Sequence, residues 1–448
     1  MNPSALKTIP RLRELPLLGS ALPFKNKRLE LLKRIARECG EIGAFRVAHY
    51  DFALVNSPRL CPAVLIDNFE DYDGGPRAEH IGALLGPNSF GLLLGEEHKK
   101  HRKFAAPAFQ YRRVLTDYTP HMAAFSRDFE RSLKDGSELD VSEAMKRLIL
   151  RIVAKTLLDV DNFELDEELS AALKVCLAYV EYLTVSIFPA PLSWPTPRNR
   201  RFLAARDLLR SRVKGFIEKA RAERNDRGGF LSIMLSARDE NGVGLDDLQL
   251  RDHVLTAFVG GYDTTTHTLT WLWYQLMKNP EVYARVKHEV DTVLQGRLVT
   301  AEDLPRLGYT LQVLKETLRM YPAGYILARR AVKDIAVGEY VLRKGQNALV
   351  SPYTLHRNPD VFPDPERFDP DRFEPEREKQ LPRHAYLPFG VGPHVCIGMH
   401  FALVEMQLVV ASMVQGVHLE LLPGPPVKEV ILGSLRPSPF RARVQRRG

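Results

Sequence analysis

The chain has 448 residues, of which 45% are hydrophobic and 26% are charged, an ordinary globular composition that allows a large core. The formal net charge of +8 comes from basic residues that are spread out rather than interleaved with aromatic residues, which argues against nucleic-acid binding. Four scattered cysteines without paired spacing argue against a disulfide framework and a zinc ribbon, and they favour a reducing, cytoplasmic compartment.

The first segment of the chain predicts neither a signal peptide nor a membrane span. Residues 1–27 lack a charged start followed by an apolar run, and they lack about 18 continuous apolar residues, so we interpret them as an N-terminal arm. Residues 28–39 have the pattern of a helix, and two short strands are predicted after it within 44–58.

The middle of the chain, from about residue 97 to 290, has a mostly helical pattern. Apolar residues recur three or four positions apart in 114–134, 142–160 and 202–224. The proline-rich segment 186–201 predicts a loop between two of these helices. Residues 248–279 are apolar on most faces, which predicts a long helix through the middle of the molecule.

The last third of the chain combines helices with short strands. A helix is predicted to end at Pro322, short strands fall within 334–352, and a proline-rich stretch covers 362–373. Another helix and further short strands finish the chain. We therefore expect one mainly α domain (α+β) over residues 1–448, with a small β-rich region.

Cys396 lies in the loop FGVGPHVCIG at 389–398, directly before an apolar helical pattern. Gly390, Gly392 and Gly398 let the main chain approach a flat ligand. Free N–H groups and the dipole of the following helix favour a thiolate. A lone thiolate beside an apolar wall suits a haem iron, whereas zinc would need about four ligands.

Two other interpretations of Cys396 stay open on the residues alone. It can be a buried, inert cysteine, which is the more common case, although such a residue does not need glycines around it. It can also be the nucleophile of a cysteine hydrolase, for which His394 is the local candidate base.

The long helical segment contains a second unusual feature. Gly260 and Gly261, each costing about 1 kcal/mol relative to alanine, precede Asp263 and Thr264 in an otherwise apolar helix. One interpretation is structural: the Thr264 hydroxyl bonds back to the carbonyl of Gly260 and bends the helix. The same opening makes room for a small ligand such as dioxygen, with an acid and an alcohol placed to relay protons.

These features resemble the cytochrome P450 superfamily, the haem-thiolate monooxygenases. In the loop pattern FxxGxRxCxG, His394 replaces the usual arginine. The matching residues of that pattern are Phe389, Gly392, Cys396 and Gly398. The oxygen-activating helix pattern (A/G)Gx(D/E)T(T/S) is met in full at 260–265.

The resemblance extends to a Glu-Arg-Arg network. Glu316 and Arg319 meet the pattern ExxR, although a pair at this spacing is by itself what an ordinary helix surface shows. The PxRF element that completes the network is best matched at 370–373, with Arg372, and we interpret the earlier PERF at 365–368 as a decoy.

The resemblance also implies residues that hold the haem propionates. In the early-helix pattern WxxxR, His98 replaces the tryptophan and Arg102 is kept. Arg329 matches another propionate-binding position, although the adjacent Arg330 leaves that register open. His394 would meet a propionate as a hydrogen-bond donor, so we expect haem binding to survive with a weaker grip.

The function implied by the resemblance is monooxygenation with a haem b (iron protoporphyrin IX). One oxygen atom of O2 enters a lipophilic substrate by hydroxylation or epoxidation, and Asp263 and Thr264 deliver the protons. No fused reductase is expected, so electrons would come from a separate ferredoxin and its reductase. Lys99, Lys100 and Lys103 lie in the region where such partners dock, although a solvated charge run is an equally good interpretation. We expect a monomer.

The substrate pocket is expected, by family position, to be mostly apolar, which favours a fatty acid, terpenoid, steroid or macrocycle. Its predicted lining residues are Ala257, Gly261, Tyr325, Ile326 and Leu435. Tyr325 supplies one polar group, and Arg77, nearer the expected mouth of the pocket, is interpreted as a surface residue.

Other functions of the same fold are a peroxide-driven peroxygenase, a rearrangement enzyme and a non-catalytic haem or lipid carrier. The first two typically lack the acid–alcohol pair, so intact Asp263 and Thr264 argue against them. A carrier does not need that pair, so normal turnover of alanine variants at these positions would favour it.

Overall fold

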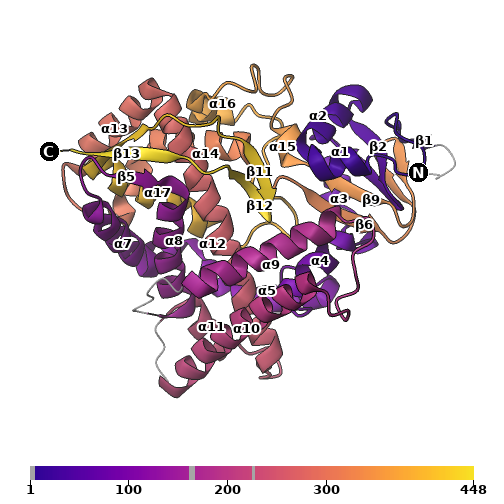
Figure 1. Cartoon of the computed structure of the whole chain (residues 1–448), viewed down its shortest axis with the longest axis horizontal. Helices are drawn as coiled ribbons and strands as arrows, with labels where there is room; N and C mark the ends of the chain where they lie inside the picture. The colour runs from indigo at the N-terminus through magenta and orange to yellow at the C-terminus, as the bar shows by residue number, and fades with distance from the viewer. Residues whose placement is uncertain (1–5, 161–166, 224–227, 448) are drawn as a thin grey trace.

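A computed structural model describes residues 6–160, 167–223 and 228–447. It is dominated by helices, with the strands gathered in small sheets, so the prediction of a mainly α chain with a minor β region is confirmed (Figure 1). The helices are α1 (Ala21–Asn26), α2 (Arg28–Cys39), α3 (Cys61–Leu65), α4 (Gly75–Leu85), α5 (Gly95–Ala105), α6 (Tyr111–Arg113), α7 (Thr119–Ser132), α8 (Val141–Leu158), α9 (Glu167–Val185), α10 (Pro197–Glu223), α11 (Phe230–Ser236), α12 (Asp247–Lys278), α13 (Pro280–Leu294), α14 (Gly308–Met320), α15 (Pro352–Leu355), α16 (Pro375–Glu378) and α17 (Met399–Gly416).

The strands form one five-stranded sheet and three smaller units. In the five-stranded sheet the order is β2-β3-β9-β6-β4, and only the β3–β9 pair is parallel. The smaller units have the orders β1-β8-β7, β10-β13-β5 and β11-β12. The strands are β1 (Lys7–Thr8), β2 (Ile42–Val47), β3 (Tyr50–Val55), β4 (Tyr72–Asp73), β5 (Glu138–Asp140), β6 (Leu327–Ala331), β7 (Ile335–Val337), β8 (Tyr340–Leu342), β9 (Asn347–Val350), β10 (Val417–Leu421), β11 (Glu429–Leu432), β12 (Ser434–Pro437) and β13 (Arg441–Arg446).

The long helix α12 crosses the interior, as its apolar faces predicted. Its first turn is closed by a capping box, in which the Asp246 side chain accepts from the N–H of Gln249 and the Gln249 side chain accepts from Asp246 N–H. Most of its residues are buried, and it packs against α8, α10, α14 and β12. This helix therefore brings the segment 260–265 to the centre of the fold.

Two predicted boundaries were wrong by a few residues. The predicted loop 186–201 ends earlier, because α10 begins at Pro197, where proline is well suited to a first helical turn. The hydroxyl of Thr196 accepts from the N–H of Asn199 and caps that turn. The turn between the first two predicted strands comes earlier than expected, because β2 ends at Val47 and β3 begins at Tyr50. Ala48 makes this tight turn with a positive φ of 53°.

The N-terminal arm lies on the domain over its described part. Strand β1 pairs with β8, and the N–H of Leu12 donates to the carbonyl of Ala44 in β2. Among the described residues, α17 is the one helix long and apolar enough to cross a membrane, and two thirds of it is buried within the protein. A core helix of a folded domain has this property.

Candidate functional site

The loop 389–398 has a backbone that requires two of its glycines. Gly390 and Gly392 have φ values of 72° and 78°, in the left-handed region. A Cβ on Gly392 would overlap the carbonyl oxygen of Leu65, so the loop passes α3 at a distance that only glycine allows. The N–H of Cys396 donates to the carbonyl of Phe389 at 2.9 Å, which closes the loop just before α17.

Cys396 is the one exposed cysteine of the described chain. Although solvent reaches the residue, protein surrounds its sulfur closely enough to raise the pKa of the thiol, against the opposing effects of the Gly398 N–H and the Arg102 charge. By contrast, burial raises the pKa of Cys61 and Cys176 to about 12, which makes them inert structural residues. The described residues contain no group of three or more His, Cys, Asp or Glu side chains that could hold a metal ion.

Four basic side chains near Cys396 lack an acidic partner. The guanidinium of Arg102 donates to the carbonyl of Val395 at 2.7 Å, and one nitrogen of Arg329 donates to its neighbour's carbonyl. The imidazole rings of His98 and His394 stack with centroids 3.9 Å apart. Both nitrogens of His98, Nε2 of His394 and Nε of Arg329 are buried without a hydrogen-bond partner in the described structure.

This cluster (His98, Arg102, Arg329 and His394) is short of negative charge. Burial and the nearby Arg102 and Arg329 lower the pKa of His98 to about 4. Burial, followed by Arg329, His98 and Arg102, lowers the pKa of His394 to about 3. Buried donors and cations without partners are costly, so the cluster calls for an anionic group.

The structure distinguishes Arg329 from its neighbour Arg330. Arg330 pairs with Asp73 at 2.9 Å and with Glu79 at 3.4 Å, so its charge is already compensated. Arg329 is the preceding residue of β6, so its side chain leaves the opposite face of the sheet, and its charge lowers the pKa of both histidines. A haem, which carries an iron for the thiol of Cys396 and two carboxylates for the basic cluster, fits this donor set.

The helix α12 presents an open space at Gly260. This glycine is exposed although it lies midway along a buried helix, and a Cβ placed on it would have no atom within 4 Å. The hydroxyl of Thr264 donates to the carbonyl of Gly260 at 2.6 Å, as the structural interpretation expected. Gly261 faces Val153 and Leu157 of α8 instead, so Gly260 is the glycine beside the open space.

Asp263 is engaged on the side of α12 that faces β12. Its carboxylate accepts from the hydroxyl of Ser434 at 2.6 Å and lies 3.3 Å from the guanidinium of Arg436. His267, one turn further on, lies 3.6 Å from the same carboxylate and 3.1 Å from the Ser434 hydroxyl. Burial lowers the pKa of His267 to about 4, so this histidine is a neutral partner.

The sequence interpretation missed His267 and Arg436. The i, i+4 spacing of Asp263 and His267 was a signal that could have found the first. Arg436 lies 173 residues away from Asp263, and no local pattern connects them. Only the packing of the β11–β12 hairpin against α12 brings the two together.

The pair Glu316–Arg319 is completely buried. Two guanidinium nitrogens of Arg319 donate to the two carboxylate oxygens of Glu316 at 2.7 and 2.9 Å, and both side chains have 0% exposure. Arg372 lies 3.5 Å from the same carboxylate, and the N–H of Asp369 donates to it at 2.8 Å. The 370–373 segment therefore meets this pair, and the 365–368 segment contributes only the carbonyl of Arg367.

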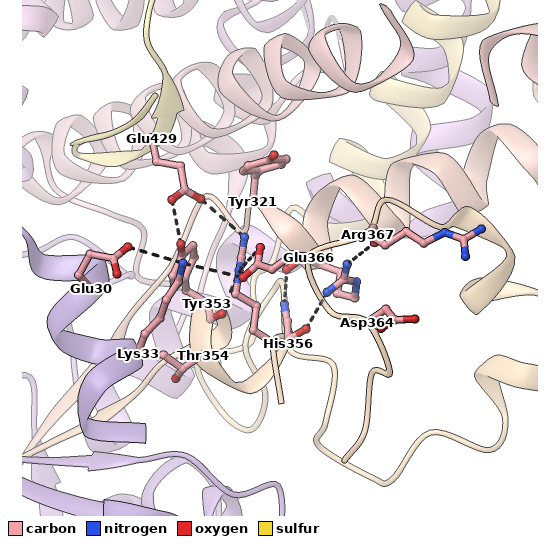
Figure 2. Close-up of polar contacts among 12 residues, drawn as sticks. Glu30, Lys33, Tyr321, Tyr353, Thr354, His356, Asp364, Glu366, Arg367 and Glu429 are labelled. Carbon is pink, nitrogen blue, oxygen red and sulfur yellow. Dashed lines mark hydrogen bonds and ion pairs between the residues drawn. The ribbon is translucent and has the colours of Figure 1, made fainter. Parts of the chain in front are cut away.

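The carbonyl of His356 connects this pair to a second polar network (Figure 2). Arg319 donates to that carbonyl at 2.8 Å, and the imidazole of His356 accepts from the N–H of Leu387 at 2.8 Å. The next residue, Arg357, pairs with Glu366 at 3.1 Å and lies 3.6 Å from Glu429. Figure 2 shows Tyr353 beside Glu429, to whose carboxylate the Tyr353 hydroxyl donates at 2.8 Å.

The buried imidazole of His356 is expected to make stability depend on pH. Burial, followed by the charge of Arg319, lowers its pKa to about 3, so it stays neutral while an unfolded histidine takes up a proton near pH 6.5. The contribution of the neutral His356 side chain to the free energy of unfolding is complete above the pKa of an unfolded histidine, and it is lost as the pH falls below that value. Between about pH 7.5 and about pH 5.5 the loss is about 1.4 kcal/mol.

Urea unfolding of the wild type and of His356→Gln at both pH values measures this contribution. The variant should lose less stability on acidification, by about the same 1.4 kcal/mol. A His288→Gln control, at an exposed histidine, should keep the wild-type dependence. An equal pH dependence in all three proteins would contradict the assignment.

The predicted pocket residues fall into two groups. Tyr325 and Ile326 line a cavity of about 100 Å³, together with Arg77, so Arg77 faces this cavity. Ala257 and Leu435 are buried, at 7% and 0% exposure, on α12 and β12. Neither of the latter two belongs to the wall of that cavity.

The lysines of α5 all have acidic neighbours. Lys99 pairs with Glu96 at 2.7 Å, and Lys100 pairs with Asp239 at 2.9 Å. Lys103 lies 3.4 Å from the exposed Glu240. This surface is therefore less positive than the lysine spacing suggested, and such exposed pairs contribute little to stability.

Comparison with known proteins gives a consistent set of relatives. A family model described as Cytochrome P450 matches residues 9–441. Cyclooctat-9-en-7-ol 5-monooxygenase of Streptomyces melanosporofaciens is 36% identical over 416 residues, which cover 91% of this chain and 89% of the relative. Cyclooctatin synthase of the same organism is 33% identical over 445 residues, with 95% and 93% covered. Pentalenene oxygenase of Streptomyces avermitilis is 29% identical over 435 residues, with 96% of each chain covered.

Proposed function

This chain belongs to the cytochrome P450 family and is a monooxygenase of that family, and from this premise we propose a specific reaction for it. One oxygen atom of O2 is inserted into a lipophilic substrate by hydroxylation or epoxidation. The observation that carries the proposal is the accessible thiol of Cys396 next to a basic cluster that has no acidic partner of its own.

The cofactor in this proposal is haem b. Cys396 would ligate the iron, and Arg102, Arg329, His98 and His394 would hold the propionate carboxylates. When bound, the haem supplies the oxygen-activating chemistry, with electron density from the thiolate. The glycines of the loop 389–398 keep the backbone close to the α3 side and leave the sulfur accessible.

Protons in this proposal travel through Asp263 and Thr264. The hydroxyl of Thr264 is held beside the open space at Gly260 by its hydrogen bond to the Gly260 carbonyl. Asp263 would take protons on the β12 side, where Ser434 and Arg436 hold its carboxylate. The acid and the alcohol therefore lie next to each other in sequence and face different surroundings.

The substrate class is inferred from the relatives and the cavity. Two relatives are named for cyclooctat-9-en-7-ol and cyclooctatin, and a third for pentalenene. The cavity next to Tyr325 is walled mainly by apolar side chains such as Leu183, Ile326 and Leu349. We therefore propose a cyclic terpenoid substrate.

The electron donors in this proposal are a separate ferredoxin and its reductase, acting on a monomer in the cytoplasm. The three lysines of α5 could contact an acidic partner, and each of them already has an acid within ion-pair distance. Docking would have to compete with these intramolecular pairs, so the association should weaken as salt is added.

Isotopic labelling tests the proposed reaction. The holoprotein, a ferredoxin, its reductase and a cyclic terpenoid are incubated under ¹⁸O₂, and the product is analysed by mass spectrometry. One ¹⁸O atom per product molecule is expected. Product that forms only with hydrogen peroxide would favour the peroxygenase, and bound terpenoid without any product would favour a carrier.

Thr264→Ala should uncouple reductant consumption from product formation. The loss of the hydroxyl removes the proton donor beside the open space. A positioned proton donor typically contributes about 10²-fold or more to the rate of the step in which it acts. Product per NADH should fall and hydrogen peroxide should rise. Thr268→Ala is the matched control, because the Thr268 hydroxyl also bonds back to a carbonyl of α12, that of Thr264, but is buried. Equal coupling in both variants would remove Thr264 from the relay.

A further inference from the structure

The cavity next to Ile326 has one uncommon polar element. The side chains of Arg28 from α2 and Tyr325, which follows α14, line the cavity, while Leu183, Ile326 and Leu349 provide apolar walls. Arg28 donates to the hydroxyl of Tyr325 at 2.6 Å. Both residues are buried, with 4% and 1% exposure.

Arg28 uses all of its nitrogens within the protein. Its Nε donates to the carbonyl of Phe24 at 3.2 Å, and its second terminal nitrogen donates to Glu181 of α9 at 2.7 Å. The guanidinium also lies over the ring of Phe24, at 4.4 Å from the centroid. The orientation of the Tyr325 hydroxyl is thus set from three separate elements, so it is preorganised.

The hydroxyl of Tyr325 accepts a hydrogen bond but has no acceptor for its own hydrogen among the described residues. A buried donor that finds no acceptor is unfavourable unless a ligand or water supplies one. The nearby cation of Arg28 polarises the hydroxyl and makes it a better donor. The cavity is therefore prepared to meet an oxygen atom that accepts a hydrogen bond.

The net charge of the group formed by Arg28, Glu181 and Tyr325 favours a ligand with a neutral oxygen. Glu181 lies 2.7 Å from Arg28 and compensates its charge, so the group of Arg28, Glu181 and Tyr325 is neutral as a whole. A carboxylate ligand at the Tyr325 hydroxyl would be desolvated without gaining the charge of Arg28, which Glu181 already compensates. Arg77, the other arginine of the cavity, has its guanidinium 6.0 Å from the centre of the Tyr325 ring.

We propose that the Tyr325 hydroxyl donates a hydrogen bond to a neutral hydroxyl or carbonyl oxygen that the substrate already carries. The monooxygenase thus selects cyclic terpenoids that have been oxygenated before, rather than bare hydrocarbons. An earlier reaction, either a hydroxylation or a capture of water by a carbocation, must supply that oxygen. This inference rests on the proposed function, because it identifies the substrate class of the same site.

Arg28 also lines a second, outer cleft of about 790 Å³, which contains Glu181 and Tyr353. The same arginine therefore lies in the wall between the inner cavity and this polar cleft. Tyr325 belongs to the inner side of that wall only. An oxygen bound to Tyr325 is consequently held in the cavity and not in the cleft.

The test compares three ring compounds of equal ring size: cyclooctane, cyclooctanol and cyclooctanecarboxylate. Their dissociation constants for the holoprotein are measured by calorimetry and by the substrate-induced spectral shift. Tyr325→Phe should weaken cyclooctanol binding about fivefold, as expected for one hydrogen bond, and leave cyclooctane binding unchanged. Thr184→Val is the matched control, since the Thr184 hydroxyl lines the same cavity but already donates to the carbonyl of Val180.

Several outcomes would overturn the proposal. For the variants, these are an unchanged ratio of cyclooctanol to cyclooctane affinity in Tyr325→Phe, or a change of that ratio in Thr184→Val as large as in Tyr325→Phe. For the wild type, they are failure to bind cyclooctanol, or tighter binding of cyclooctanecarboxylate than of cyclooctanol. Should Tyr325→Phe not yield holoprotein, Glu181→Gln replaces it. That variant leaves Arg28 uncompensated, so the preference should move about fivefold toward the carboxylate, and an unmoved preference would equally overturn the proposal.

The labelling experiment separates this inference from the proposed function. A monooxygenase that incorporates ¹⁸O but shows no effect of Tyr325→Phe on cyclooctanol binding refutes only the oxygen selection. A protein that shows the binding difference but forms no labelled product refutes the proposed reaction instead.

Discussion

Arg319→Met is expected to destabilise the folded protein by about 3–5 kcal/mol, because it removes two hydrogen bonds from the buried carboxylate of Glu316 and leaves only Arg372, 3.5 Å away, to compensate its charge. Both side chains have 0% exposure, so water cannot replace the lost hydrogen bonds. The variant also deprives the carbonyl of His356 of its donor. Urea unfolding of the purified variant, or its failure to accumulate as holoprotein, measures the effect.

The matched control for this prediction is Arg285→Met. Arg285 makes the same two-bond contact with Asp371, at 2.8 and 2.9 Å, but about half of its side chain is exposed. Solvent screens such a pair, so its removal should cost at most about 1 kcal/mol. Similar losses in the two variants would show that burial of the Glu316–Arg319 pair does not determine its contribution.

Cys396→Ala is expected to abolish the monooxygenase activity completely. The substitution removes the one exposed thiol of the described residues. The basic cluster of His98, Arg102, Arg329 and His394 is left intact, so the variant should still bind some haem by its carboxylates. The expected readout is a reduced CO adduct without the red-shifted Soret band of a thiolate ligand.

Cys61→Ala provides the control for that substitution. Cys61 is fully buried in α3, and burial raises the pKa of its thiol to about 12. Its removal should lower stability by a few kcal/mol at most and leave the spectrum unchanged. A Cys396→Ala variant that keeps the wild-type spectrum would mean that another group ligates the iron.

The local patterns of the sequence predicted the elements better than the contacts between them. Apolar periodicity located α12 to within one residue at each end, because a helix that is apolar on most faces has few alternatives. The loop before α10 was predicted too long, since proline at position 197 breaks a helix interior but is favourable in a first turn. Boundaries of this kind depend on capping, which composition alone does not show.

The sequence identified residues of the candidate site, but it did not show their burial or the contacts between them. The spacing of Glu316 and Arg319 showed a shared helix face, but the same spacing suits an exposed pair, and only the packing of 364–372 over α14 shows that they are buried. Likewise, the choice between Arg329 and Arg330 depends on Asp73, which pairs with the second arginine from a distant strand.

The contacts of Asp263 were likewise not predictable from the sequence. Its position next to Thr264 follows from the helix, whereas its contacts with Ser434 and Arg436 come from a hairpin near the end of the chain. The free hydrogen of the Tyr325 hydroxyl is a further case, because it depends on where Arg28 and Glu181 donate and accept. Long-range contacts of this kind leave no periodic trace in a single sequence.

The reduced CO difference spectrum of the purified wild-type protein, supplied with haemin if necessary, tests the thiolate assignment most directly. A red-shifted Soret band that disappears in Cys396→Ala is the predicted result. A protein that takes up no haem, or one whose CO adduct lacks that band, would contradict the account.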